Sequence, residues 1–305
     1  MARLVQQLVN GTVLGATIGL IALGYTMVYG IIQLINFAHG EIFMIGAFSG
    51  LYAYNHFIPE AWRSNTVVAL PLVIVAAMVA STAVAVAAER FAYRPLRNAP
   101  RLAPLITAIG VSIALQETVR LFYPGGKNLQ SFPRLISDRT YHIGDVSIPE
   151  TAIFTVVTAL VLMLALEFFV NRTRLGKAMR ATAQDAETAM LMGIDTNKVI
   201  VVAFALGGAL AGVAGVIQGV RFSQIDFRIG FLAGIKAFTA AVLGGIGNIR
   251  GAVLGGFVIG IVEALATEYI PHGGAWKDVW AFVVLIVVLT VRPQGLLGER
   301  VAVRT

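Results

Sequence analysis

The residues of this sequence best suited to chemistry or binding are a few polar side chains within long apolar runs. Asn36, His39 and Glu41 stand together near the start of one run, and Lys236 stands inside another. Ionisable groups in such runs are costly and tend to face a protein interior or a water-filled path. Two roles are open for all four: they pair with neighbouring helices and hold the fold, or they line a translocation path.

The sequence lacks the patterns that would support catalysis or metal binding. His39 and Glu41 are two residues apart, so on a helix they point in different directions, and the other histidines are scattered. No Gly-x-Ser-x-Gly, zinc-protease or kinase signature occurs, so no catalytic residue and no metal site is assigned. A phosphate-binding loop is also missing, because the pair Gly176 and Lys177 has neither a glycine at position 171 nor a hydroxyl residue at position 178. No cofactor is expected in this chain, and energy from ATP would have to come through a partner chain.

Composition places the chain in a membrane. Hydrophobic residues make up 57% of it, charged residues only 13%, and the mean hydropathy is +0.80, whereas soluble domains carry about 25% charged residues. Several separate apolar runs of about 20 residues predict an all-α, polytopic helical protein. The net charge of +7 is typical of cytoplasmic loops facing anionic lipid, so it does not indicate nucleic-acid binding.

The apolar runs predict nine transmembrane helices. They lie near residues 10–31, 35–56, 66–88, 102–121, 151–171, 198–220, 230–247, 251–270 and 277–292. If the runs at 35–56 and 230–247 are broken or re-entrant, the count becomes eight or ten. Basic clusters in the loop 89–101, in the segment 172–198 and at Arg292, Arg300 and Arg304 favour a cytoplasmic location for all three. The N-terminus and the partly extended loop 122–150 are then outside, and the C-terminus is inside.

One internal similarity indicates a repeat. Residues 35–48 (INFAHGEIFMIGAF) align without gaps with 225–238 (IDFRIGFLAGIKAF). The identities are Ile35, Phe37, Gly40, Ala47 and Phe48 with Ile225, Phe227, Gly230, Ala237 and Phe238. Because the segments lie five spans apart, the copies would run in opposite directions, as in inverted-repeat transporters. We expect copies around 10–121 and 198–292; the alternative is a chance match between helices rich in glycine and phenylalanine.

The polar segment 172–197 lies between two apolar runs and reads as one amphipathic helix from Ala178 to Met192. Small residues recur on one of its faces, while Arg180, Gln184 and Glu187 lie on another. The helix either packs into a groove of a partner or lies on anionic lipid. Small residues insert poorly into lipid, which favours the partner.

Four stretches resemble a known family. They are GYTMVYGIIQLINFAHGEIFMIGAF (24–48), ERFAYRPLR (89–97), LGKAMRATAQDAETAMLMGID (175–195) and GIKAFTAAVLGGIGNIRGAVLGGFVIGIVEAL (234–265). In order and spacing they are similar to branched-chain amino-acid ABC importer permeases of the LivH type. The resemblance implies a single permease domain over 1–305, in the bacterial inner (plasma) membrane. It also implies a homologous LivM-type permease as partner, two cytoplasmic ATPase subunits that bind ATP, and a periplasmic binding protein delivering leucine, isoleucine or valine.

In ABC permeases a cytoplasmic loop with an EAA-like pattern forms a coupling helix that rests in a groove of the ATPase. The matching positions here are Ala183, Asp185 and Ala186, followed by Gly193 and Ile194. The resemblance therefore implies that the segment 172–197 couples to the ATPase, with Arg180 and Glu187 at the rim. Asp185 stands where the general pattern has Glu.

Other functions stay open at this stage. Urea, short amides or other amino acids are possible substrates of related permeases. A self-sufficient secondary transporter or channel would also explain a repeat and buried charges. It would not explain an ordered helix in an inside loop of a chain without an ATP site.

Overall fold

The apolar runs form helices. The computed structural model describes residues 2–34, 36–97, 99–100 and 102–298, so Ile35, Arg101, Arg300 and Arg304 lie outside the described residues. The helices are α1 (Ala2–Ile32), α2 (His39–His56), α3 (Glu60–Arg63), α4 (Thr66–Ala88), α5 (Leu102–Phe122), α6 (Glu150–Arg172), α7 (Arg174–Gln184), α8 (Ala186–Leu191), α9 (Thr196–Phe222), α10 (Ile229–Gly244), α11 (Ile249–Tyr269) and α12 (Lys277–Val291). Each of the nine expected runs contains one helix, which confirms a helical polytopic membrane protein.

Six of the described helices are long and apolar enough to cross a membrane. They are Ala2–Ile32, Thr66–Leu96, Leu102–Phe122, Glu150–Arg172, Thr196–Phe222 and Ile249–Tyr269. The helices α2, α10 and α12 are shorter, with 18, 16 and 15 residues. A helix rises 1.5 Å per residue, so each of these covers only about 22–27 Å of an apolar core about 30 Å thick.

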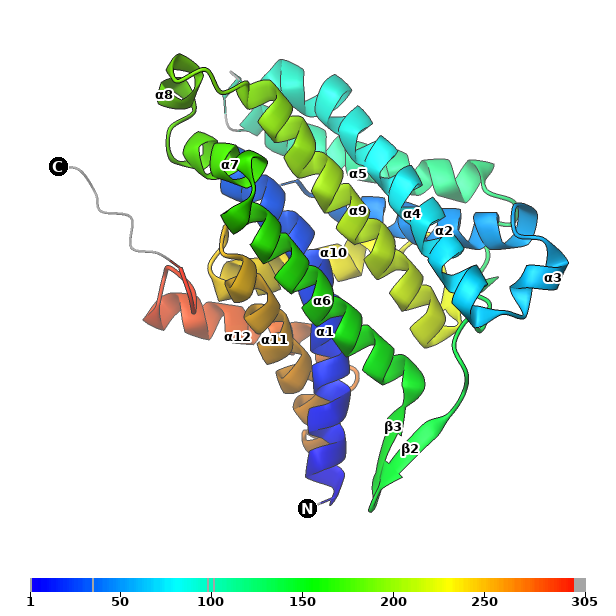
Figure 1. The fold of residues 1–305 in the computed structure, drawn as a ribbon. Helices are drawn as coiled ribbons and strands as arrows, with labels where there is room; N and C mark the ends of the chain where they lie inside the picture. Colours follow the sequence, from blue (N-terminus) through cyan, green and yellow to red (C-terminus); the bar gives the residue numbers. More distant parts are fainter. Residues whose placement is uncertain (1, 35, 98, 101, 299–305) are drawn as a thin grey trace.

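The molecule has two distinct ends (Figure 1). The N-terminus lies at one end beside the hairpin of β2 (Thr140–Ile143) and β3 (Val146–Pro149), whereas α7 and α8 lie at the opposite end. The side chain of Gln6 fastens the first end, because it donates to Ser147 O (3.1 Å) and accepts from Ser147 N (2.8 Å). The predicted extended element between residues 122 and 150 is thus confirmed as a hairpin.

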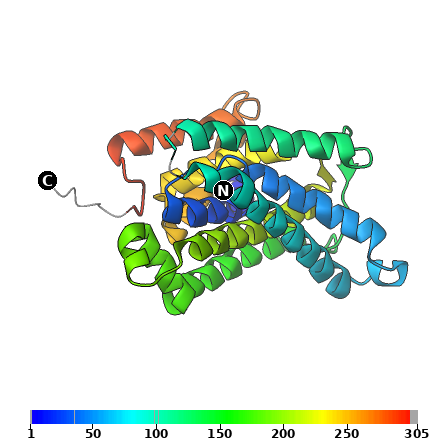
Figure 2. The ribbon, with the colours of Figure 1, turned by 90° about the horizontal axis from the view of Figure 1, so that it is seen from above.

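Small residues bring the central helices into close contact. Helix α1 packs along α11, and α9 packs along α4. A Cβ added to Gly15 would come within 2.8 Å of the carbonyl oxygen of Gly256, and one added to Gly212 within 2.7 Å of that of Ala77. Such close approach is how helices associate in lipid, where burial of apolar surface gives little drive. Seen from above, α6 and α9 lie along one side of α1, and α5 and α12 along the other (Figure 2).

Two segments differ from the sequence expectation. The basic stretch 89–101 is helical as far as Leu96, because α4 continues through a π-helical turn (Glu89–Tyr93) and a 3-10 turn (Arg94–Leu96). The second difference concerns β-structure: β1 (Gln130–Ser131) pairs antiparallel with β4 (Gln224–Ile225). This pairing joins the 122–150 loop to the stretch that precedes α10, so the fold is helical with two short two-stranded ribbons.

Candidate functional site

The candidate site lies where α2 and α10 cross. These helices begin at His39 and Ile229, 190 residues apart, and neither start has a side-chain cap. The crossing is close because both helices carry a glycine in their first turn. A Cβ added to Gly230 would come within 2.7 Å of Gly40 O, and one added to Gly40 within 2.9 Å of the Gly234 Cα. Backbone therefore meets backbone here, and the side chains beside the two glycines are held in place.

The structure brings Asn36, His39 and Glu41 together at the start of α2, all buried. The Tyr93 hydroxyl donates to Asn36 Oδ1 (2.6 Å). The His39 ring packs edge-on against Tyr25, with ring centroids 4.7 Å apart.

Glu41 is the acidic member of this group. The Ser112 hydroxyl of α5 donates to Glu41 Oε1 over 3.4 Å, a long hydrogen bond. Its second oxygen, Oε2, has no hydrogen-bond partner among the described residues, and no described cation forms a salt bridge with it. Burying a carboxylate in this way is costly unless something compensates the charge. That the three residues line a path stays a prediction.

Lys236 lies in a different environment. Its ammonium group donates to both carboxylate oxygens of Glu263 (2.9 and 2.8 Å) and lies 2.6 Å from Asp278 Oδ1. This ion cluster joins α10, α11 and α12, and it confirms the ion-pair interpretation of Lys236. The preceding residue, Ile235, faces the cavity described next, and Lys236 is not among the residues that line that cavity.

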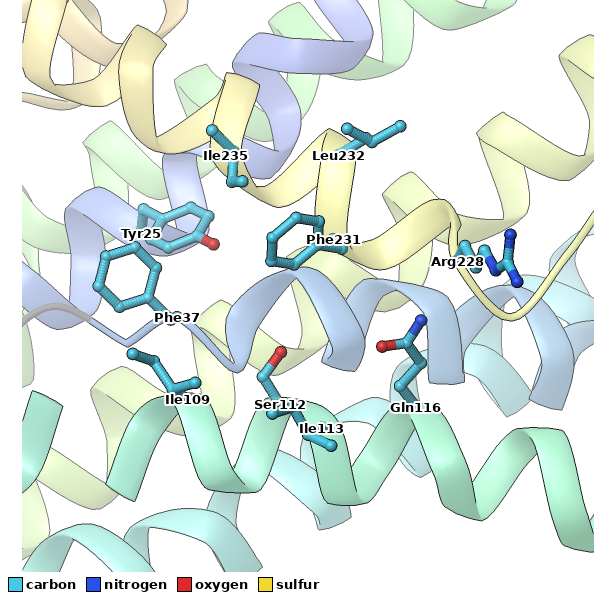
Figure 3. A pocket seen from close by; sticks show the side chains of 10 residues that line it. All are labelled: Tyr25, Phe37, Ile109, Ser112, Ile113, Gln116, Arg228, Phe231, Leu232 and Ile235. Atoms are coloured by element: carbon cyan, nitrogen blue, oxygen red, sulfur yellow. The ribbon is translucent and has the colours of Figure 1, made fainter. Parts of the chain in front are cut away.

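A cavity of about 650 Å³ lies beside the crossing, between α1, α5 and α10 (Figure 3). Its walls are mostly apolar, and its polar groups come from Ser112 and Gln116 on α5, Tyr25 on α1 and Arg228. The full lining is Tyr25, Phe37, Ile109, Ser112, Ile113, Gln116, Arg228, Phe231, Leu232 and Ile235. The sequence analysis missed Ser112, Gln116 and Arg228. The signal available was the pair of polar residues four apart on an otherwise apolar helix, which places both on one face.

The segment 172–197 forms two helices, so the expectation of one continuous helix from Ala178 to Met192 was wrong. The chain is extended at Asp185 (φ −158°, ψ 104°), where α7 ends and α8 begins. Asp185 caps α8: Oδ1 accepts from the N–H groups of Glu187 and Thr188 (both 3.0 Å), and Oδ2 from the Thr188 hydroxyl (2.6 Å). These hydrogen bonds, the Thr188 hydroxyl's first, hold the pKa of Asp185 below its ordinary value.

The small-residue face of this segment turns only partly toward the permease core. Thr182 and Ala189 are buried, as is Met179. Arg180, Asp185, Ala186, Glu187 and Gly193 are all exposed, and Gly193 (φ +83°) closes α8 in the left-handed region.

The outward face of the segment is apolar at the end of α8. Leu191 is 86% exposed, Met192 79% and Met190 52%. The sequence did not predict these three residues, because the small-residue face was expected to meet the partner, with Arg180 and Glu187 at the rim.

The two internal basic clusters lie at the same end of the molecule. Arg97 Nη1 donates to Asn197 Oδ1 over 2.6 Å, and Arg97 also pairs with the buried carboxylate of Glu89. The sequence analysis placed both clusters on one side of the membrane, and this contact between their ends agrees.

The long apolar helices, the glycine-mediated packing and the cavity among helices define a helical membrane permease. The family described as "Branched-chain amino acid transport system / permease component" matches residues 7–289. The chain belongs to that family.

Three relatives support this membership. The high-affinity branched-chain amino acid transport system permease protein BraD of Pseudomonas aeruginosa is 46% identical, covering 96% of this chain and 95% of the relative. The corresponding LivH protein of Escherichia coli K12 is 45% identical over the same shares. A probable branched-chain amino acid transport permease protein LivH of Methanocaldococcus jannaschii is 28% identical, covering 92% and 88%.

Proposed function

We propose that this chain is a transmembrane permease subunit of a binding-protein-dependent ABC importer for leucine, isoleucine and valine. The observation that carries the proposal is the near full-length identity of 45–46% to permeases named for branched-chain amino-acid transport. The chain itself carries no phosphate-binding loop, so ATP would be bound by partner subunits, and this chain would be no enzyme.

The transmembrane arrangement we propose has nine passes. Six helices are long enough alone, and α2, α10 and α12 would complete a pass together with the non-helical residues at their ends. The end with α7 and α8 would be cytoplasmic, because the basic clusters gather there. The N-terminus and the β2–β3 hairpin would be periplasmic in a bacterial inner membrane.

We further propose that α1–α5 and α9–α12 are two inverted copies within a single domain, with the segment 172–197 between them. In this arrangement α1, α2 and α4 correspond to α9, α10 and α11. The packing supports it, because each contact has its counterpart: α1 packs on α11 as α9 packs on α4, and α2 packs on α4 as α10 packs on α11. The crossing helices α2 and α10, which begin 190 residues apart, pack on each other. Transporters with such repeats bind substrate near the interface of the copies.

Coupling to the ATPase would use the exposed end of α8. Leu191 and Met192 are large apolar side chains that stand free of the permease core, which suits anchors in a partner's pocket. Arg180 and Glu187 would make rim contacts, while Asp185 and Gly193 would set the two ends of α8. Movement of α7 and α8 would reach the core through the buried Met179, Thr182 and Ala189.

The proposed assembly contains a homologous LivM-type permease, two cytoplasmic ATPase subunits and a periplasmic amino-acid-binding protein. Urea, short amides or other amino acids are the alternative substrates within the same class. A self-sufficient secondary transporter is the alternative from another class, and an ordered α7–α8 element in a chain without an ATP site speaks against it.

Reconstitution tests the proposal. In proteoliposomes containing the two permeases and the ATPase subunits, leucine should accumulate only when ATP and the binding protein are supplied. Uptake by this chain alone, driven by an ion gradient, would contradict the proposal. If the full assembly takes up urea and not leucine, the chain is still an ABC importer permease, but branched-chain amino acids are not its substrates.

A further inference from the structure

The cavity between α1, α5 and α10 combines apolar walls with one charged lining residue, Arg228, and a buried carboxyl group behind its wall, Glu41. Ile109 and Ile113 on α5 and Phe231 and Leu232 on α10 line it (Figure 3). Its volume of about 650 Å³ lies within the range of roughly 300–1,000 Å³ that is usual for small-molecule sites.

One end of the cavity is cationic. Arg228 lies there, and no carboxylate among the described residues forms a salt bridge with its guanidinium. The nearby Asp226 is engaged with the backbone, since its Oδ1 accepts from Arg228 N at 2.5 Å. In Figure 3 Gln116 lies on the same side of the cavity as Arg228. A guanidinium together with an amide N–H is a suitable set of donors for a carboxylate.

A buried carboxyl group lies behind the middle of the cavity. Ser112 lies about one helical turn from Gln116, four residues or about 6 Å along α5, and its hydroxyl joins the cavity to Glu41, which does not itself line the cavity. Glu41 is fully buried, and its Oε2 has no partner among the described residues. Nothing in the described part of the chain supplies the positive charge that would offset this carboxylate.

We propose that the cavity binds a branched-chain amino acid as a zwitterion during its passage. Arg228 and Gln116 would hold the carboxylate. The Ser112 hydroxyl would accept from the ammonium group, with Glu41 behind it offsetting the positive charge, and the apolar walls near Phe37 and Ile109 would hold the side chain. This rests on the proposed function and sharpens it, because an uncharged molecule such as urea would leave both Arg228 and Glu41 uncompensated. Such a site binds weakly, as transport requires that the substrate can leave.

Protection of an introduced thiol tests this proposal. The chain contains no cysteine, so Leu232→Cys, or Ile113→Cys on the opposite wall, gives this chain a single thiol. Each variant is assembled with the partner permease and ATPase subunits in nanodiscs, without the binding protein, and the rate of N-ethylmaleimide labelling is followed by the mass of this chain. Leucine at twice its Kd should slow labelling about threefold, because only the unoccupied fraction reacts. 4-Methylpentanoate, which lacks the ammonium group, and 3-methylbutylamine, which lacks the carboxylate, should protect far less.

Charge variants locate the two ends of the ligand. Glu41→Gln and Arg228→Gln should each raise the leucine concentration needed for protection on the order of tenfold, the effect of losing a charge-assisted hydrogen bond. The matched controls are Glu117→Gln and Arg120→Gln, which alter an ion pair on α5 that does not line the cavity. Unchanged labelling rates without leucine would show that the variants keep the cavity intact.

Two results would overturn the proposal in distinguishable ways. If the assembly imports leucine with ATP and the binding protein, yet leucine protects neither thiol, the cavity is not the site and the proposed function stands. If the same assembly imports urea and not leucine, the proposed substrate falls together with this site.

Discussion

The crossing helices α2 and α10 begin in the same way, but their buried ionisable side chains differ in how they are paired. Both follow a non-helical stretch, both have a glycine in the first turn, and Gly40 and Gly230 meet at the crossing. On α2 the buried Glu41 has only a long hydrogen bond to Ser112. On α10 the cation Lys236 is held by two carboxylates, Glu263 and Asp278.

This difference separates residues that hold the fold from residues that could act in transport. The crossing of α2 and α10 holds the fold, because backbone meets backbone at Gly40 and Gly230 and no side chain fits there. The two helices carry their ionisable groups differently: Lys236 joins α10 to α11 and α12 through ion pairs, whereas the buried Glu41 has no ion-pair partner among the described residues. We therefore expect changes at the crossing and at Lys236 to affect folding, and a change at Glu41 to affect transport.

The largest effect should come from filling the crossing. Gly40→Val places a side chain against Gly230 and Gly234, where backbone atoms cannot move aside, so the folded permease should be lost from membranes. The matched control is Gly110→Val on α5, because a Cβ at Gly110 meets nothing within 4 Å. Immunoblotting of solubilised, size-fractionated protein measures this. Equal amounts of the two folded variants in membranes would show that the crossing is not close-packed.

The next largest effect should follow loss of Lys236. Lys236→Ala leaves the mostly buried Glu263 without its partner, and removing one member of a buried pair costs about 3–5 kcal/mol. Thermal unfolding in detergent should show a clear drop in melting temperature. Adding Glu263→Gln should restore part of it, since the uncompensated charge is then gone. A drop of the same size in the double variant would contradict the pairing.

A third prediction concerns the segment 172–197, which we propose to be cytoplasmic and to lie outside both proposed copies. Leu191→Ser combined with Met192→Ser removes the exposed apolar end of α8 and should weaken ATPase binding by on the order of tenfold or more. The permease should still insert and melt normally, because neither side chain contributes to the core. Gln184→Ala, an exposed change on α7, serves as control. Binding is measured by co-purification titration, and undiminished binding would refute the anchor role.

The smallest effect should come from Asp185→Asn. Asparagine caps helices about as well as aspartate, so ATP hydrolysis stimulated by the binding protein should stay near that of the native chain. The lowered pKa of Asp185 means that its stabilising contribution is present above the ordinary carboxylate pKa and is lost only as pH falls through the folded value. Coupling measured at pH 8 and pH 5.5 should therefore differ no more in the native chain than in the Asp185→Asn variant. A selective loss in the native chain at pH 5.5 would contradict this.

Much of the fold could be predicted from hydropathy alone. Each of the nine apolar runs contains a helix, and the glycines near 244–247 form the expected turn between α10 and α11. The break at Asp185 was not predicted, because the apolar spacing continues across it and only the capping hydrogen bonds show where α8 starts. The continuation of α4 past Glu89 was not predicted either. The arginines after Glu89 are typical of a loop, but the backbone there stays helical.

The site was predicted in part. Burial of Asn36, His39 and Glu41 beside one another follows from their place in an apolar run, and the ion pair of Lys236 was among the expectations. The cavity could not be foreseen, because Arg228 lies more than a hundred residues after Ser112 and Gln116, and only packing brings them together. The exposed Leu191 and Met192 were missed for a different reason: the small-residue face was expected to meet the partner, whereas Thr182 and Ala189 on that face are buried.

Glu41→Gln tests most directly whether α2 and α10 use charge for different purposes. The variant keeps the shape of the side chain and removes its negative charge, so the account predicts normal amounts of assembled transporter and an unchanged melting temperature. ATP-driven leucine uptake into proteoliposomes should fall on the order of tenfold, as expected for one lost charge-assisted contact. Unchanged uptake, or a drop in melting temperature like that expected for Lys236→Ala, would contradict this division of roles.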